Sequence, residues 1–239
     1  MKRRGGLLTV FLAGALVILI VGATAVALAL SGHIHIDGLT PRKVAGRLVE
    51  AGRFNAGAIV VENVVGNVRI VESNVSGVVL MSNIPINTSY RDGLLTVYCP
   101  KKKTLLGEHN VCSEYRNGTV VIEVGASLAD VWFRDVVGDV EIDAPTTRIL
   151  AEDVVGDITA APEAGYQLED IVGDVSIVAG GDVVIQDVVG DVVIAVPEDF
   201  SVHLSADDVV GDVRNLHSGE GMPILITVSD VVGDVTVGE

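Results

Sequence analysis

The residues best able to do chemistry are the aspartates of a six-residue string that the chain repeats six times. The string reads Asp-Val-Val-Gly-Asp-Val, with Ile171 and Ile158 as the two exceptions. Its first aspartates are Asp135, Asp153, Asp170, Asp187, Asp208 and Asp230, and its second are Asp139, Asp157, Asp174, Asp191, Asp212 and Asp234. If each copy occupies one layer of a stack, equivalent carboxylates align in two columns about 4.8 Å apart. Such charges repel by roughly 0.9 kcal/mol even in bulk water.

Two arrangements would offset that repulsion, and the sequence leaves both open. Backbone N–H groups at a turn can donate to the aspartates, as they do in Asx turns. Alternatively, Ca²⁺ can bridge the carboxylates, since it prefers oxygen ligands at 2.3–2.6 Å. The twelve aspartates are therefore a candidate Ca²⁺ ladder, and no other cofactor is indicated.

An enzyme is not predicted. Acid pairs on β-helical proteins can cleave polysaccharides, and such an enzyme is the least favoured alternative. That chemistry requires two acids in different environments, whereas these aspartates recur in identical surroundings. The five histidines are scattered along the chain and do not supply a complete ligand set. They are His33, His35, His109, His203 and His217.

The spacing of the string predicts the fold. Successive copies begin 18, 17, 17, 21 and 22 residues apart, and periods of this length indicate a stacked repeat. After each Gly-Asp, apolar and variable residues alternate, as in Val140-Glu141-Ile142, which is the strand period. We therefore expect an all-β, single-stranded β-solenoid (β-helix) of 17–22-residue coils after one N-terminal transmembrane helix, with a β-sandwich as the lesser alternative.

The N-terminus predicts the compartment. Leu7 to Leu30 form 24 residues without a charge, enough to cross a bilayer as a helix. The preceding Lys2-Arg3-Arg4 favours a cytoplasmic N-terminus, so the protein is expected at the cell membrane, single-pass, with an extracellular ectodomain. A cleaved signal peptide, ending near Ala25 to Ala29, remains the alternative.

The expected organisation has five parts. They are a basic cytoplasmic tail (1–6), the transmembrane anchor (7–30), a juxtamembrane linker with a short helix (31–57), irregular N-terminal coils (58–134) and regular acidic repeats (135–239). The helix is expected between Thr40 and Gly52, because Thr40 fits an N-cap, Pro41 the first helical position and Gly52 the C-terminal stop.

Exported proteins form disulfides, and Cys99 and Cys112 are the only cysteines, so we predict that they are bonded. Three Asn-X-Ser/Thr sequons, at Asn74, Asn87 and Asn117, are candidate glycosylation sites. Residues 135–239 carry 23 acidic side chains against Arg148 and Arg214. This surface disfavours nucleic acid and favours cations or basic partners.

Three segments resemble the adhesin-like β-solenoid family of bacteria and archaea. Val60–Ile70 resembles the opening of that family, Asp92–Val97 its middle strand, and Val121–Leu128 its transition into regular coils. The resemblance implies a cell-surface, adhesin-like role and brings no catalytic residues with it. The loop between Cys99 and Cys112 and the uniform string depart from the family pattern.

Two functions follow as hypotheses. The first is a structural or adhesive rod that binds cell-surface carbohydrate, protein or another copy of itself. The second is a subunit of an extracellular filament, since Gly5 after the basic tail faintly resembles a prepilin processing site.

Two surface features are expected from the string. If the chain stays extended through the string, alternation predicts an outward apolar stripe formed by Val137, Val155, Val172, Val189, Val210 and Val232. The alternative is a corner within the string that breaks the alternation and hides both valine columns. The last string, Asp230–Val235, is expected to form an uncapped end, and self-association through it should strengthen with Ca²⁺ or salt, which screen the aspartates. The alternative is a rod that stays monomeric because Asp234 and Glu239 prevent the contact.

Overall fold

The computed structural model describes residues 42–104 and 107–238. These residues fall into two compact units. The described part of the smaller unit is an antiparallel hairpin of β8 (Lys101–Thr104) and β9 (Gly107–Asn110). The larger unit contains residues 42–100 and 111–238 and is described below.

The larger unit is built from strands and one short 3-10 turn. Its first part comprises β1 (Lys43–Val44), β2 (Val49–Phe54), β3 (Ala58–Glu62), β4 (Asn67–Glu72), β5 (Val78–Ser82), β6 (Asn87–Arg91), β7 (Leu94–Tyr98), η1 (Val111–Glu114), β10 (Tyr115–Arg116) and β11 (Thr119–Val124). Its second part comprises β12 (Leu128–Val137), β13 (Val140–Asp143), β14 (Thr146–Val155), β15 (Ile158–Val172), β16 (Val175–Val189), β17 (Val192–Ala195), β18 (Phe200–Val210), β19 (Val213–Asn215), β20 (Met222–Val232) and β21 (Val235–Gly238).

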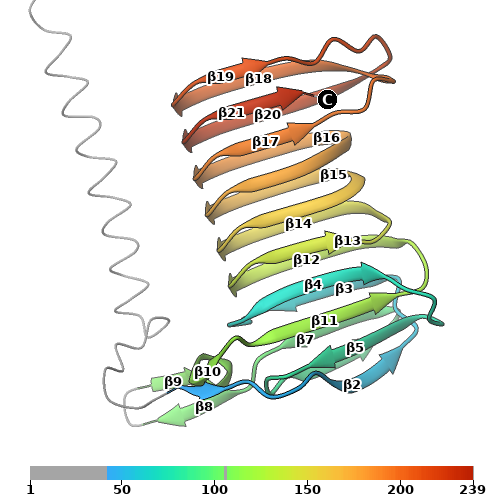
Figure 1. Ribbon diagram of the computed structural model, residues 1–239, viewed down its shortest axis with the longest axis vertical. Coiled ribbons are helices and arrows are strands. Elements are labelled where there is room, and N and C mark those ends of the chain that lie inside the picture. The colour runs from blue at the N-terminus through green and yellow to red at the C-terminus, as the bar shows by residue number, and fades with distance from the viewer. Residues whose placement is uncertain (1–41, 105–106, 239) are drawn as a thin grey trace, which may run out of the picture. The chain divides into compact units, whose positions relative to one another are not determined.

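The strands form two ladders that face each other across the core (Figure 1). One runs β6–β7–β3–β12–β14–β15–β16–β20–β18, and the other runs β2–β5–β11–β4–β13–β15–β16–β17–β21–β19. We call one circuit of the chain, with a strand in each ladder, a layer. The long strands β15 and β16 contribute to both ladders, so all the strands named belong to a single 17-stranded sheet.

Each repeated string forms the corner where the chain turns from the first ladder into the second. Its second residue and its last residue point inward, so Val136 and Val140 are at most 1% exposed. The layers lie in register, as the parallel pairing of Val136 with Val154 and of Val154 with Ile171 shows. The inward side chains therefore stack into one continuous apolar core, and burying that core stabilises layers that could not fold singly.

The predicted fold class is wrong. A single-stranded β-solenoid would stack its coils in chain order with parallel pairing, whereas this single 17-stranded sheet is mixed. Strands β2, β5 and β6 pair antiparallel to their neighbours. The layers are also out of chain order, because β3 and β4 lie against β12 and β13.

The predicted C-terminal open end is wrong for the same reason. Strand β20 pairs with β16 on one side and β18 on the other, so the last string lies between two layers. Val235 is fully buried. The outermost layer is formed by β18 and β19, which precede the last string in the chain.

The expected short helix is also wrong within the described residues. Residues 43–44 and 49–54 are strands, because they pair with β10 and β5. These pairings satisfy backbone groups that a short helix would leave to solvent, so tertiary contacts override the local capping signals. The predicted anchor, 7–30, lies outside the described residues. Among those that are described, no helix is both long enough and apolar enough to span a membrane.

Candidate functional site

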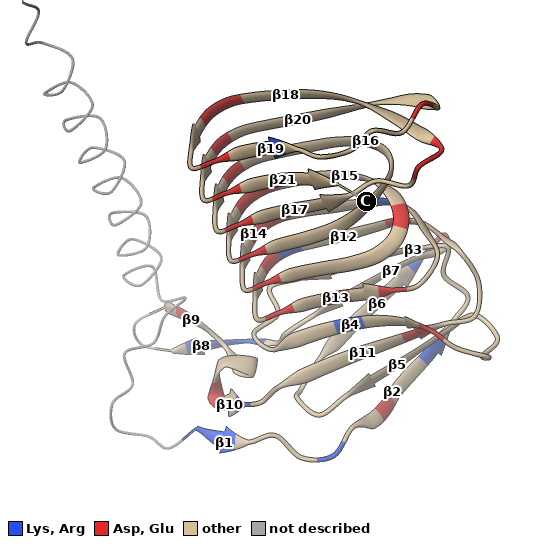
Figure 2. Ribbon diagram, turned by 45° about the horizontal axis from the view of Figure 1, so that its top comes forward, with Lys and Arg blue, Asp and Glu red and all other residues tan. Residues whose placement is uncertain are grey.

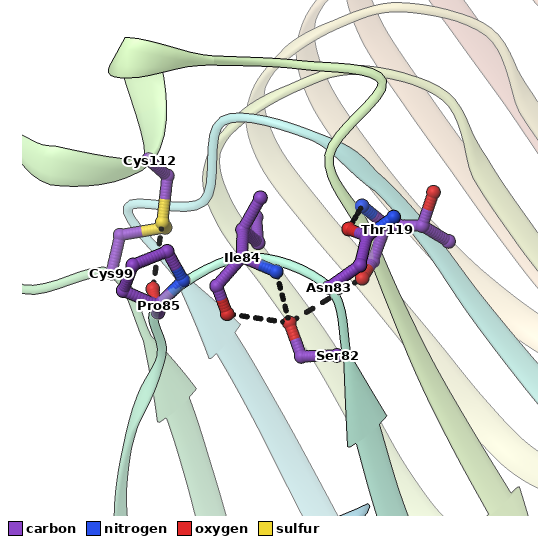
Figure 3. Close-up of a disulfide and its surroundings, with 7 residues drawn as sticks. All are labelled: Ser82, Asn83, Ile84, Pro85, Cys99, Cys112 and Thr119. Carbon is purple, nitrogen blue, oxygen red and sulfur yellow. Dashed lines mark hydrogen bonds between the residues drawn. A yellow bond between two sulfur atoms is a disulfide. The ribbon is translucent and has the colours of Figure 1, made fainter. Parts of the chain in front are cut away.

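The predicted disulfide between Cys99 and Cys112 is present. Their Cα atoms are 5.8 Å apart, and both residues are buried. Cys112 Sγ lies 3.1 Å from the carbonyl oxygen of Pro85 (Figure 3). In the same loop the buried Ser82 hydroxyl donates to the carbonyl of Ile84 and accepts the Ile84 N–H (Figure 3). These contacts make Ser82 a structural residue that holds the loop beside the disulfide.

The first aspartate column occupies the bend of the corner (Figure 2). Along the stack it runs Asp135, Asp153, Asp170, Asp187, Asp230 and Asp208. All six have a left-handed backbone, with φ between +49° and +56°, and Asn63 shares it with φ +54°. Asp and Asn adopt this conformation more readily than other non-glycine residues. The first reason for an aspartate at this position is therefore the left-handed backbone conformation of the corner.

The glycine of each string is required by a close approach between layers. Gly156 has φ +146°, and a Cβ there would collide with the carbonyl oxygen of Gly138 one layer away. Only glycine fits this position. The corners consequently stack in contact, which fixes the spacing of both aspartate columns.

The second aspartate column is a chain of hydrogen bonds from layer to layer. Asp174 Oδ1 accepts the backbone N–H of Asp191, and Asp191 Oδ1 accepts that of Asp234, each at 2.9 Å. The column starts at Asn67, whose Oδ1 accepts the Asp139 N–H at 3.2 Å, and ends at Asp212. There Arg214 donates to Asp212 Oδ2 at 2.7 Å. Backbone donors thus offset the repulsion, which is the first of the two arrangements considered.

The described residues contain no group of three or more His, Cys, Asp or Glu side chains placed to hold a metal ion. The Ca²⁺ ladder therefore stays a prediction from sequence. Like-charge repulsion nevertheless persists in the first column, where burial, followed by neighbouring Asp135 and Asp170, raises the pKa of Asp153. Burial, followed by Asp170 and Asp230, likewise raises the pKa of Asp187.

The predicted valine stripe is confirmed by exposure. Val137, Val155, Val172, Val210 and Val232 are 37–65% exposed, and Val189 is half-buried. Register pairing orders them Val137, Val155, Val172, Val189, Val232 and Val210 along one line. The stripe lies between the two aspartate columns, because each valine stands between the two aspartates of its own string. The result is a repeated surface of apolar and acidic groups.

Neither the three predicted glycosylation sites nor the histidines, which were assigned to no site, converge among the described residues. Asn74, Asn87 and Asn117 are all exposed, but they lie in different loops and strands. His33 and His35 lie outside the described residues, and His109 is in the β8–β9 hairpin. His203 is exposed in β18, and the half-buried His217 shares a 2.9 Å hydrogen bond with the carbonyl of Phe200.

Two features escaped the sequence reasoning. Arginines pair with acids one layer away, as in Arg69 with Glu141, Arg134 with Glu152 and Arg148 with Asp130. These pairs are exposed and each contributes at most about 1 kcal/mol. The other feature is an open depression whose lining includes Arg42, Arg116 and Asn67 together with the stripe residues Val137 and Val155. Locating this depression from sequence would have required knowing that Asn67 lies beside Asp139, 72 residues further along the chain.

The chain is similar to known proteins in its structure only. No protein-family model matches the chain, and no curated protein does. A "putative cell adhesion protein" from Clostridium sporogenes superposes with a TM-score of 0.44 at 11% identity, covering 80% of this chain and 97% of the other. A "putative adhesin" from Bacteroides fragilis gives 0.39 at 13% identity, covering 81% and 99%. A "putative lipid binding protein" from Parabacteroides distasonis gives 0.33 at 13%, covering 82% and 99%. Identities and TM-scores at this level define neither a family nor a function for this chain.

Proposed function

We propose that this protein is a non-catalytic binding protein with an adhesin-like role, displayed outside the cell by the apolar segment 7–30. The observation that carries the proposal is the valine stripe between its two aspartate columns. The same apolar and acidic pattern recurs in register over six layers. A surface that repeats along the stack in this way suits a macromolecule better than a small substrate, which needs an enclosed concave site.

The chemistry of the surface indicates the class of partner. Its carboxylates repel anionic polymers, whereas basic side chains would be attracted to the aspartate columns. Exposed valines add apolar contact area that a continuous stripe can offer and scattered residues cannot. We therefore propose a protein surface with basic and apolar groups as the partner, ahead of carbohydrate.

The extracytoplasmic location has one structural support. The Cys99–Cys112 disulfide is buried, and bonds of this type persist in oxidising compartments. The sequence adds the apolar segment and its basic flank. Protease protection of the full chain in intact cells tests the location, since the ectodomain should be cleaved from outside.

The binding role is tested by displaying the full chain on cells that lack it and counting attachment to protein-coated surfaces and to other cells. A variant with Val155→Ser and Val172→Ser interrupts the stripe. The matched control changes Val184→Ser and Val193→Ser, which are exposed valines outside the stripe. The proposal predicts that the stripe variant loses attachment and the control keeps it. Equal attachment by both variants, or none above that of undecorated cells, refutes it.

A further inference from the structure

Both ends of the stack present strands with an unpaired edge. At one end β18 pairs with β20 and β19 pairs with β21, and no described strand pairs with their other edges. At the opposite end β2 pairs with β5 and β6 with β7, again without a second partner among the described strands. Free edges of this kind can accept a strand from another chain.

The end formed by β18 and β19 is also incompletely covered. Val213 occupies the same place in its layer as Val235, but it is 42% exposed, whereas Val235 is fully buried. Leu216, which follows β19, is 68% exposed. Stacked folds usually close such an end with a polar cap, and the described residues supply none here. One further layer would cover these side chains.

The two ends carry opposite charge. We define the acidic end as residues 198–222 and the basic end as residues 42–54, 87–92 and 114–116. The acidic end contains Glu198, Asp199, Asp207, Asp208, Asp212 and Glu220 against Arg214. The basic end contains Arg42, Lys43, Arg47, Arg53, Arg91 and Arg116 against Glu50, Asp92 and Glu114.

The opposite charges lie at the same corner of the stack. Arg42 and Arg116 line the same depression as Val65 and Asn67, where the corner line begins. The line ends at Asp208 and Asp212, the last members of the two aspartate columns. A copy stacked in line with the first would therefore place its arginines against the aspartates of its neighbour.

Strand direction permits that contact. Strand β6 runs antiparallel to β7, and every pairing from β7 to β18 is parallel, so β6 runs antiparallel to β18. Strand β2 is related to β11 through two antiparallel pairings, and therefore runs parallel to β11 and to β19. Strand direction in a stacked copy is therefore antiparallel between β6 and β18 and parallel between β2 and β19, and β2 lies one strand further out than β6.

We propose that the acidic end of one molecule docks onto the basic end of a second copy of this chain, head to tail. Edge strands, uncovered apolar side chains and opposite charge all meet in this contact. Contact between two acidic ends would instead bring together two surfaces that each carry five net negative charges, and these would repel each other. A head-to-tail contact leaves a free end of each kind, so it extends into a filament unless it closes into a ring. The inference does not depend on the proposed binding by the valine stripe.

The test measures the size of the full chain in mild detergent by sedimentation velocity at two ionic strengths. At about 0.01 M salt the Debye length is about 30 Å, and at about 1 M it is about 3 Å. We expect assemblies that grow with protein concentration at low salt and dissociate at high salt. A chain that is monomeric at low salt, or association that strengthens with salt as expected for two acidic ends, overturns the proposal.

Charge reversal supplies the decisive comparison. Asp207→Lys and Arg116→Glu alter exposed residues of the acidic and basic ends. Each alone is expected to weaken association by about tenfold, and the double variant should recover most of the loss. Asp143→Lys, an exposed position between the ends, is the matched control.

Glu220→Lys replaces Asp207→Lys should the latter lower the melting temperature. Single variants that associate as well as the control, or a double variant worse than both singles, refute the docking mode. Because the stripe is intact in all of these variants, cell attachment reports separately on the proposed function.

Discussion

Asp191 Oδ1 accepts the backbone N–H of Asp234 at 2.9 Å, although 43 residues separate the two in the chain. The same bond joins residues 17, 18, 22 or 72 apart elsewhere in the column. The carboxylate therefore joins layers, and it does so regardless of chain order. This relationship explains why a strongly acidic string can stack upon itself.

Asp191 should be replaceable by Asn but not by Ala. The amide oxygen of Asn can accept the Asp234 N–H and removes a negative charge, and Asn67 occupies the equivalent place in its own layer. Asp191→Ala removes the acceptor and should lower the free energy of unfolding by about 0.5–1.5 kcal/mol. Asp191→Asn should match or exceed the parent in denaturant unfolding. If both variants lose the same stability, the hydrogen bond is not what holds these layers.

Gly156→Ala should be strongly destabilising. Its φ of +146° disfavours any side chain, and the added Cβ would meet the Gly138 carbonyl. Strained backbone of this kind costs about 1–3 kcal/mol before the collision is counted. Gly46→Ala is the control, because no atom lies within 4 Å of its Cβ, and it should change stability by less than about 0.5 kcal/mol. Comparable unfolding midpoints for the two variants would contradict the stacked corner.

Loss of the disulfide should weaken the fold. Closing a loop of this length stabilises a protein by roughly 3 kcal/mol, so the variant with Cys99→Ala and Cys112→Ala should unfold at lower denaturant concentration. Reductant should lower the midpoint of the parent and leave the variant unchanged. A parent that is insensitive to reductant after full reduction, shown by thiol labelling, would refute the expected contribution.

Mild acid should stabilise the first aspartate column. Asp153 and Asp187 have pKa values raised above the ordinary value of 3.8. At pH values between the ordinary and the raised pKa, the folded state therefore binds more protons than the unfolded state. Their contribution to the free energy of unfolding therefore rises as pH falls through the raised values and is complete below the ordinary value of 3.8. Asp153→Asn should flatten this dependence while keeping the left-handed corner, as Asn63 does. Thermal unfolding of both proteins from neutral pH to pH about 4 gives the difference in their free energies of unfolding, which isolates the contribution of Asp153. A difference that is independent of pH would falsify the assignment.

The surface chemistry was predictable because it depends on local alternation. Val136 is buried and Val137 is exposed as the strand period requires, and the Cys99–Cys112 bond was predictable because these are the only two cysteines of the chain. The helix expected near Pro41 failed because β10 and β5 offer pairing partners that no local signal reveals.

The sequence by itself determined that this protein is all-β, that each string makes a corner, and which valines and aspartates face outward. These properties arise within one string, from the strand period and from the backbone conformations that Asp and Gly tolerate. Only the tertiary structure decided which layers are neighbours, because nearly identical strings can pair with one another equally well. It placed the last string between β16 and β18 and left β18–β19 as the outermost layer. The acidic and basic ends exist for that reason, since they depend on long-range register that repeated residues cannot specify.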